Sequence, residues 1–189
     1  RPWLLHVSNH STVKQHGIFY EVVRRVRQSI PDAIGTIIGN SYPAAKWNVG
    51  RLGVQGGCWY RCRVASSMRN DVTLRWNVPR SDVVSAIQEA NITFLTSAFE
   101  CSGLVLLESS AAGTPWISFD LGHVRDYPGG VIARDEDEMT KIAIDLLSNP
   151  SKCRSLGDEG QQGVRERYSW KAIAEQYETL YETVLARTT

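Results

Sequence analysis

The sequence has 189 residues, of which 42% are hydrophobic and 22% charged, so it has the composition of one globular domain and is neither disordered nor collagen-like. Its 21 basic and 20 acidic residues give a formal net charge of +1, which does not indicate a nucleic-acid-binding protein. Four cysteines are too few for a disulfide scaffold, and no apolar run approaches the ~18–20 residues of a membrane-spanning helix.

Short apolar runs alternate with helical periods along the first half of the chain. An amphipathic helix is predicted over residues 17–30, where apolar side chains recur every three or four positions, and Pro31 ends it. Residues 41–57 hold glycines and a proline without a period, which predicts an irregular surface insertion before a helix over 59–68. Strands are predicted over residues 3–7, 33–38 and 72–76.

The second half continues the alternation. Ser81 and Asp82 are expected to cap a helix that runs to about Ala90, and a helix over 104–112 stops at Gly113. Short apolar strands between helices predict a single α/β domain over residues 1–189, with a doubly wound, Rossmann-like parallel sheet of about six strands. The other predicted elements are strands over 92–95, 116–119 and 131–133 and closing helices over 136–148, 151–166 and 170–186.

Several familiar motifs are absent from the sequence. No G-x-G-x-x-G follows the first strand, and Cys58 and Cys62 have no second pair or histidine at ligand spacing, so we expect no metal site. The Asp135-Glu136-Asp137 run has the D-x-D pattern of some metal–nucleotide sites, but acidic residues are also favoured at a helix N-terminus. Of the histidines, His6 is expected in the core and the others near strand ends, where ligands of such sheets bind: His10, His16 and His123.

One segment, residues 97–115, leaves the carboxyl end of the fourth predicted strand and enters a helix. Ser102 and Gly103 open that helix, so the free amides near Gly103, Leu104 and Val105 are expected to form an anion site, and phosphate is the usual anion. The run 104–107 is apolar on every side and predicts a buried helix start.

Glu100 precedes this anion site and Glu108 follows it, with seven residues between them. Two carboxylates placed at opposite ends of a ligand can accept hydrogen bonds from pairs of neighbouring hydroxyls. A ligand with hydroxyls at both ends and phosphates between them is a nucleotide sugar. On the residues alone, a solvated Glu100 and a surface Glu108 on an amphipathic helix stay as the alternative.

This segment resembles the E-x7-E motif of the retaining glycosyltransferases of family 4, the glycosyl transferases group 1, which have the GT-B fold. The residues that match in order and spacing are Glu100, Ser102, Gly103, Glu108, Ala111, Gly113 and Pro115. The resemblance extends over nearly the whole chain and implies the C-terminal, donor-binding half of that fold. It also implies a UDP- or GDP-linked sugar as the donor, no metal and no other cofactor.

The resemblance implies roles for individual residues. Glu100 would bind hydroxyls of the transferred sugar and Lys14 would stabilise the diphosphate, so these two are the expected catalytic residues. Glu108 would hold the ribose hydroxyls, and the nucleobase would lie near Val78. Further donor contacts are expected from Cys101, Ser102, Gly103, Leu104 and Val105.

One departure from the family concerns the end of the first strand. Many members have Gly-Arg there, with the arginine on the diphosphate, whereas this sequence has Ser8 and Asn9. Asn9 is therefore expected beside the donor, and His10 or Arg80 is the candidate to replace the missing charge.

The chain begins with Arg1, so we expect it to be part of a longer protein whose N-terminal domain binds the acceptor. The last helix is expected to cross to that domain through Tyr177, Leu180, Tyr181 and Val184. The fragment alone is expected to bind donor but to transfer sugar poorly. Two alternatives stay open: a non-catalytic nucleotide-sugar binding module, and half of a sugar-nucleotide epimerase. A cytoplasmic location is expected, with any membrane contact made by the absent half.

Overall fold

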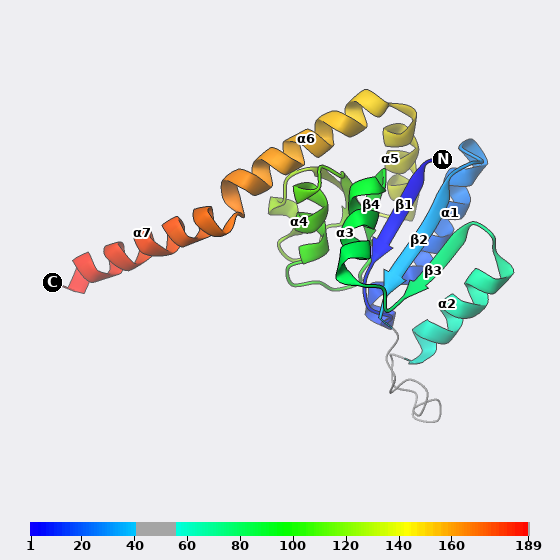
Figure 1. The fold of residues 1–189 in the computed structure, drawn as a ribbon, viewed down its shortest axis with the longest axis horizontal. Coiled ribbons are helices and arrows are strands. Elements are labelled where there is room, and N and C mark those ends of the chain that lie inside the picture. The colour runs from blue at the N-terminus through cyan, green and yellow to red at the C-terminus, as the bar shows by residue number, and fades with distance from the viewer. Residues whose placement is uncertain (41–55, 189) are drawn as a thin grey trace.

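Six parallel strands form one sheet in the computed structural model, which describes residues 1–40 and 56–188, the side chains of 56–61 and 188 excepted (Figure 1). The strand order is β3-β2-β1-β4-β5-β6, and every neighbouring pair is parallel. This is the doubly wound, Rossmann-like arrangement that the sequence predicts. The strands are β1 (Trp3–Val7), β2 (Ile34–Gly39), β3 (Val72–Trp76), β4 (Ile92–Leu95), β5 (Trp116–Phe119) and β6 (Gly130–Ala133).

Helices cover both faces of the sheet. In the described part of the chain, α1 and α5 pack together on one face, α3 and α4 lie on the other, and α6 packs against α4 and α5. Two short 3₁₀ turns, η1 (Thr12–Lys14) and η3 (Val124–Asp126), were not predicted. The α-helices are α1 (His16–Ser29), α2 (Gly56–Met68), α3 (Arg80–Glu89), α4 (Leu104–Ala111), α5 (Glu136–Ser148), α6 (Pro150–Arg167) and α7 (Trp170–Thr188).

The packing of the core explains why the strands appear in the sequence as continuous apolar runs. Consecutive residues Leu4 and Leu5 of β1 are both fully buried but in opposite layers. Leu4 packs in the cluster that contains Phe19 of α1, whereas Leu5 packs in the cluster that contains Val83 and Ile87 of α3. A sheet covered on both faces has no polar side, so its strands do not alternate.

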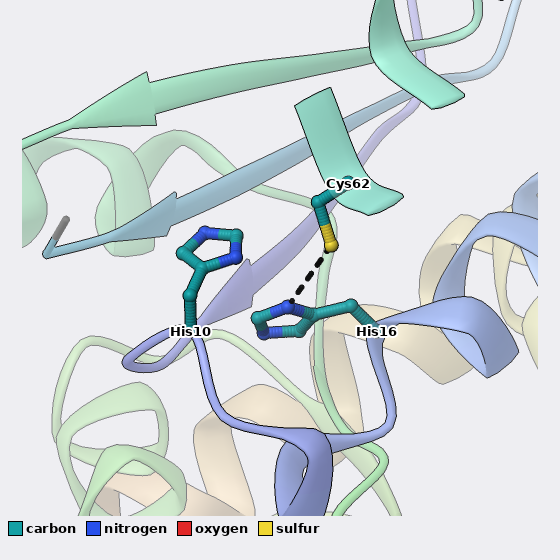
Figure 2. Close-up of side chains that lie close together, drawn as sticks. All are labelled: His10, His16 and Cys62. Carbon is teal, nitrogen blue, oxygen red and sulfur yellow. Dashed lines mark hydrogen bonds between the residues drawn. The ribbon is translucent and has the colours of Figure 1, made fainter. Parts of the chain in front are cut away.

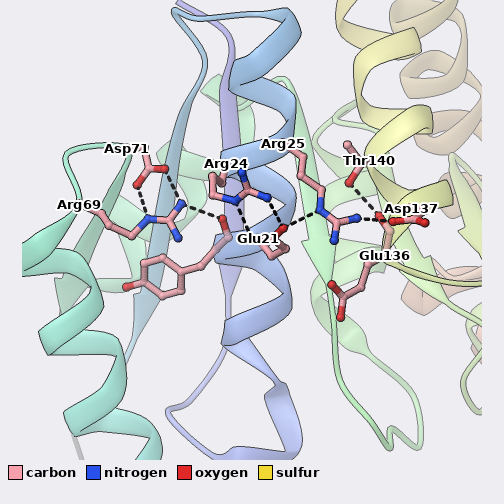
Figure 3. A network of polar contacts seen from close by, with 9 residues as sticks. Glu21, Arg24, Arg25, Arg69, Asp71, Glu136, Asp137 and Thr140 are labelled. Carbon is pink, nitrogen blue, oxygen red and sulfur yellow. Dashed lines mark hydrogen bonds and ion pairs between the residues drawn. The ribbon is translucent and has the colours of Figure 1, made fainter.

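Ion pairs fix α1 against its neighbours (Figure 3). Arg25 donates to Glu21 on the same helix at 2.6 Å and also to Asp137 of α5. Arg69, which follows α2, donates to the backbone carbonyl of Tyr20 at 3.3 Å. These contacts join α1, α2 and α5 around the same face of the sheet.

Several sequence predictions about helix ends are tested by the structure. Asp135 caps α5 by accepting a hydrogen bond from the Glu138 amide at 2.8 Å, and Glu136 and Asp137 lie in the first turn, so the interpretation of the acidic run as a helix N-terminus is confirmed. The expected cap at Ser81 and Asp82 is wrong, because α3 already begins at Arg80 after an extended Pro79. Of the predicted insertion over 41–57, residues 41–55 lie outside the described part of the chain, and residues 56 and 57 belong to α2.

Two general expectations concern thiols and membrane spans. The cysteines whose side chains the structure describes, Cys62, Cys101 and Cys153, form no disulfide. Among the described residues, no helix combines the length and the apolar character needed to cross a membrane.

Candidate functional site

A cleft of about 460 Å³ opens at the carboxyl edge of the sheet. The strands β1 and β4 lie side by side there, and their following helices cover opposite faces, which is the switch point where ligands of such sheets bind. The ends of three strands contribute Val7, Gly39 and Leu95. The cleft is also lined by Ser8, Asn9, Lys14, Ile38, Asn40, Val78, Arg80, Val83, Glu100, Gly103, Leu104 and Val105.

The N-terminus of α4 forms one wall of the cleft. Gly103 precedes the helix with a φ of 42°, a left-handed conformation, and no described side chain caps this end. The first amides of a helix have no partner within it, so those near Gly103, Leu104 and Val105 stay available to a ligand. By contrast, Asp135 occupies the corresponding position of α5. The α4 terminus is therefore suited to hold an anion.

An ion pair between Lys14 and Glu100 stands at one side of this terminus. The Lys14 Nζ lies 2.5 Å from the Glu100 Oε2, and the Ser97 hydroxyl donates to the same oxygen at 3.3 Å. Lys14 ends the η1 turn, whose position is fixed because the Thr96 hydroxyl donates to the Lys14 carbonyl at 2.9 Å. Both charged side chains are largely buried, with 24% and 18% of their surfaces exposed.

A second ion pair stands at the other side. Arg80, the first residue of α3, donates to both carboxylate oxygens of Glu108 at 2.6 and 3.4 Å. Arg80 lines the cleft, and Glu108 lies one turn into α4. The uncapped helix end is thus flanked by two cation–carboxylate pairs. A diphosphate bound between them would offer both cations a more highly charged partner, which would leave both carboxylates free to accept hydrogen bonds from hydroxyls.

The loop that carries Glu100 is held by the segment that follows β5, which the sequence reasoning missed. Gly122 has a φ of 52°, and a Cβ there would lie 2.4 Å from the Glu100 carbonyl oxygen. The Tyr127 hydroxyl donates to the Ser102 carbonyl, and the His123 amide donates to the Cys101 carbonyl at 3.3 Å. Burial is the main cause that raises the pKa of Tyr127, so this phenol stays protonated and remains a donor.

The structure brings most of the predicted site residues together. Lys14 and Glu100 line the cleft, as do Asn9, Val78, Gly103, Leu104 and Val105. Cys101 is exposed and Ser102 is half-buried, and neither lines the cleft. Glu108 does not line the cleft either, but it accepts a hydrogen bond from Arg80, which does. The predicted buried start of α4 is wrong, because Leu104 is 63% exposed.

His10 lies away from the cleft lining. Its ring is 2% exposed and packs against Trp76 with the ring centroids 4.3 Å apart. Of the two residues considered as substitutes for the family's arginine, it is therefore Arg80 that stands at the cleft. His6 is fully buried as expected, and burial lowers its pKa well below the usual value, with His16 adding to the effect.

Comparisons with known proteins agree on one family. The profile of the family described as "Glycosyl transferases group 1" matches residues 1–163. The MMP alpha-(1->4)-mannosyltransferase of Mycolicibacterium hassiacum is 31% identical over 113 residues, which are 56% of this chain and 28% of that protein. The N-acetyl-alpha-D-glucosaminyl L-malate synthase of Bacillus anthracis is 30% identical over 112 residues, or 56% of this chain and 29% of that protein. The chain thus spans less than a third of these two curated relatives.

Solved structures show the same fold. Sucrose-phosphate synthase from Thermosynechococcus elongatus matches with a TM-score of 0.76 at 23% identity, over 98% of this chain and 46% of that one. The C-terminal domain of a glycosyl transferase group 1 family protein from Francisella tularensis matches with a TM-score of 0.69 at 15% identity. In that case the match covers 89% of this chain and 87% of the other. The fold is thus that of the C-terminal half of a GT-B protein.

Proposed function

Because the chain belongs to the glycosyl transferases group 1 family, we propose that its cleft binds a nucleoside-diphosphate sugar. The protein then transfers the sugar to an acceptor with retention of the anomeric configuration. The observation that supports this most directly is the uncapped N-terminus of α4 between the Lys14–Glu100 and Arg80–Glu108 ion pairs.

The diphosphate is proposed to lie against the first amides of α4. Lys14 and Arg80 turn from their carboxylates to the phosphate oxygens, where two cations and a helix N-terminus meet the charge that develops as the glycosidic bond breaks. In this arrangement protein groups supply the positive charge that Mg²⁺ supplies at many phosphate sites, so the proposed reaction needs no metal at the cleft.

The carboxylates are proposed to bind the two ends of the donor. Glu100, released by Lys14, accepts hydrogen bonds from hydroxyls of the transferred sugar, and Glu108, released by Arg80, accepts them from the ribose. Val78 lies at the cleft wall beside Arg80 and is proposed to contact the nucleobase. Asn9 completes the cleft just after the end of β1. Cys101 and Ser102 lie outside the cleft lining and are proposed to affect the sugar pocket only through the loop that they share with Glu100.

The acceptor is proposed to bind an N-terminal domain that this chain does not contain. Helix α7 extends away from the sheet and its covering helices (Figure 1). Its Tyr177, Leu180, Tyr181 and Val184 are each more than half exposed and recur at the three- and four-residue spacing of one helix face. We assign this apolar face to the contact with the acceptor domain.

Thermal unfolding with UDP, GDP, ADP and their common sugar conjugates tests the donor site. At a nucleotide concentration of about 100 times Kd, binding adds about 2.7 kcal/mol to the free energy of unfolding. For a domain of this size that raises Tm by about 5–10 °C. The expected result is a rise with nucleotides of one base, lost in Glu108→Ala.

Glu89→Ala is the matched control, because Glu89 is also a helical glutamate and lies exposed at the end of α3 opposite Arg80. It is expected to keep the full nucleotide-dependent rise. A full-length protein that shows no rise with any nucleotide, or an undiminished rise in Glu108→Ala, contradicts the proposed site.

Product analysis on the full-length protein separates the proposed transferase from its alternatives. Transfer or donor hydrolysis that releases a sugar of retained anomeric configuration supports the transferase. A C2-epimerised sugar indicates an epimerase, and nucleotide binding without turnover indicates a binding module.

A further inference from the structure

A cluster of three metal-ligating side chains lies beside the cleft, between the β1–α1 connection and α2. His10, His16 and Cys62 are all buried, and each offers one ligand atom within 4.8 Å of the other two (Figure 2). His10 comes from the loop after β1, His16 is the first residue of α1, and Cys62 lies in the middle of α2. The proposed donor site uses none of these three side chains.

The ring nitrogens of His10 are the strongest indication that this cluster binds a ligand. Its ring is 2% exposed, yet neither Nδ1 nor Nε2 has a hydrogen-bond partner, and these are the sole buried side-chain nitrogen or oxygen atoms in that condition in the described part of the chain. Burying such a group without a partner is unfavourable, so buried polar atoms are nearly always hydrogen-bonded or bound to a ligand. Figure 2 shows the ring of His10 facing the same space as the imidazole of His16 and the thiol of Cys62.

The ring of His16 is oriented by a hydrogen bond, as the ring of a metal-binding histidine typically is. The Ser8 hydroxyl lies 2.8 Å from its Nε2, so its Nδ1 faces Cys62 at 3.5 Å from the sulfur. Metal-binding histidines are typically oriented by a hydrogen bond at the ring nitrogen that does not bind the ion. Ser8 is itself anchored, since its hydroxyl also lies 3.3 Å from Nδ1 of the buried His6.

The spacing within the cluster suits a tetrahedral ion. With Zn–S at ~2.3 Å and Zn–N at ~2.0–2.1 Å, a tetrahedral site places its sulfur and nitrogen ligands roughly 3.5 Å apart. The Cys62 sulfur and the His16 Nδ1 already have that separation, at 3.5 Å. The largest separations, up to 4.8 Å, would shorten by about 1.3–1.5 Å when an ion draws in the ring of His10.

We propose that His10, His16 and Cys62 bind one Zn²⁺ ion. The Cys62 thiol loses its proton to solvent and binds as the thiolate, and the two neutral imidazoles supply the nitrogens. A cavity of about 470 Å³ is lined by both His16 and Cys62, so it gives an ion access and leaves room for water as the fourth ligand. Glu136 also lines this cavity and adds a negative charge that attracts cations.

A simpler arrangement, a hydrogen bond between the Cys62 thiol and the His16 ring, accounts for the 3.5 Å contact but not for the two unpartnered nitrogens of His10. The bound ion would join α2 to the loop that carries Asn9 and Lys14. The sequence could not indicate the site, because the two histidines lie far from Cys62 along the chain.

Metal titration of the purified protein tests the site. We expect one Zn²⁺ per chain after chelator treatment and reconstitution. With Co²⁺ as the probe, we expect the intense visible bands of a tetrahedral ion together with a thiolate-to-cobalt charge-transfer band in the near ultraviolet. Both signals require a cysteine among the ligands.

His10→Phe is the sharpest variant, because phenylalanine keeps an aromatic ring against Trp76 and removes only the nitrogens. It should weaken Zn²⁺ binding by at least ~100-fold, the upper end of the effect of losing a group that merely orients a ligand. His123→Phe and Cys153→Ser, at an exposed histidine and a half-buried cysteine outside the cluster, should leave binding unchanged.

A measurement on the unaltered protein guards against variants that fail to fold. Zn²⁺ should slow alkylation of Cys62, followed by peptide mass spectrometry, without slowing that of the exposed Cys101. The proposal is overturned if the unaltered protein binds no Zn²⁺ or Co²⁺, or if bound metal does not protect Cys62. Zn²⁺ binding of equal strength in a folded His10→Phe protein overturns it too.

Discussion

Gly103 joins the loop that carries Glu100 to the helix whose amides face the cleft. Its φ of 42° lies in the region that side chains disfavour, and an added Cβ would lie 3.0 Å from the Leu95 Cδ2. A side chain here therefore adds strain at the one point where the backbone of the proposed phosphate site changes direction.

We expect Gly103→Ala to lower the free energy of unfolding by about 1–2 kcal/mol, because a left-handed residue with a Cβ costs that much. It should also weaken nucleotide binding, since relief of the strain moves the first turn of α4. Gly113→Ala is the matched control: its φ is 77°, but the nearest atom to an added Cβ is a flexible glutamine end at 3.7 Å. Urea unfolding and nucleotide titration should show stability loss in both variants and weaker binding in Gly103→Ala alone. Equal nucleotide affinity in the two variants would contradict this expectation.

Glu21 of helix α1 forms ion pairs with both Arg24 and Arg25 (Figure 3). Hydrogen bonds from Arg24 and Arg25 lower its pKa from 4.5 to about 2. The carboxylate is thus favoured in the folded protein, and its contribution to stability is fully present above pH 4.5 and lost as the pH falls toward 2.

Glu21→Gln should therefore lower the free energy of unfolding at pH 7 by about 1 kcal/mol, the size expected for surface pairs screened by water. Urea unfolding should show this difference shrinking as the pH falls below 4.5, the ordinary pKa of a glutamate. Glu178→Gln, at an exposed position of α7, should have little effect at either pH. A destabilisation by Glu21→Gln of the same size at pH 7 and pH 3 would rule out the ion pairs as its cause.

The sequence predicts elements well where burial dictates them. Each strand is found within one or two residues of its expected range, since an apolar run covered on both faces leaves little choice. The start of α3 differs from the prediction because Pro79 sets the extended backbone before it. The prediction of a buried Leu104 is wrong because this side chain faces a cleft that only the assembled sheet creates.

The same division applies to the candidate site. Glu100 and Glu108 lie on one continuous loop and helix, so the sequence alone shows their spacing. It does not show their ion-pair partners, because Lys14 lies 86 residues from Glu100 and Arg80 lies 28 residues from Glu108. Lys14 was identified only through the family resemblance, and Gly122 was missed because its role is to let a distant loop approach the Glu100 carbonyl.

At the scale of the whole molecule, the proposed function assigns the donor to this cleft and the acceptor to a separate N-terminal domain. We expect this chain alone to bind the donor nucleotide but to transfer sugar far more slowly than the full-length protein, because no acceptor site is close to the donor. Nucleotide titration and product assays on both proteins provide the comparison. Transfer by the isolated chain at the full-length rate would contradict the assignment of the acceptor site to another domain.

The pairing of β1 with β4 has a consequence for how long the folded molecule lasts. The Trp3 amide donates to the Asn91 side chain, 88 residues away, so this pairing joins the two halves of the sheet across a long stretch of chain. Lys14–Glu100 and Arg80–Glu108 both cross between those halves. At the proposed donor site, a nucleotide bound between these two pairs would have to dissociate before the halves could separate. We therefore expect donor binding to slow unfolding more than it speeds folding, and to lengthen the lifetime of the chain against proteolysis when donor is abundant.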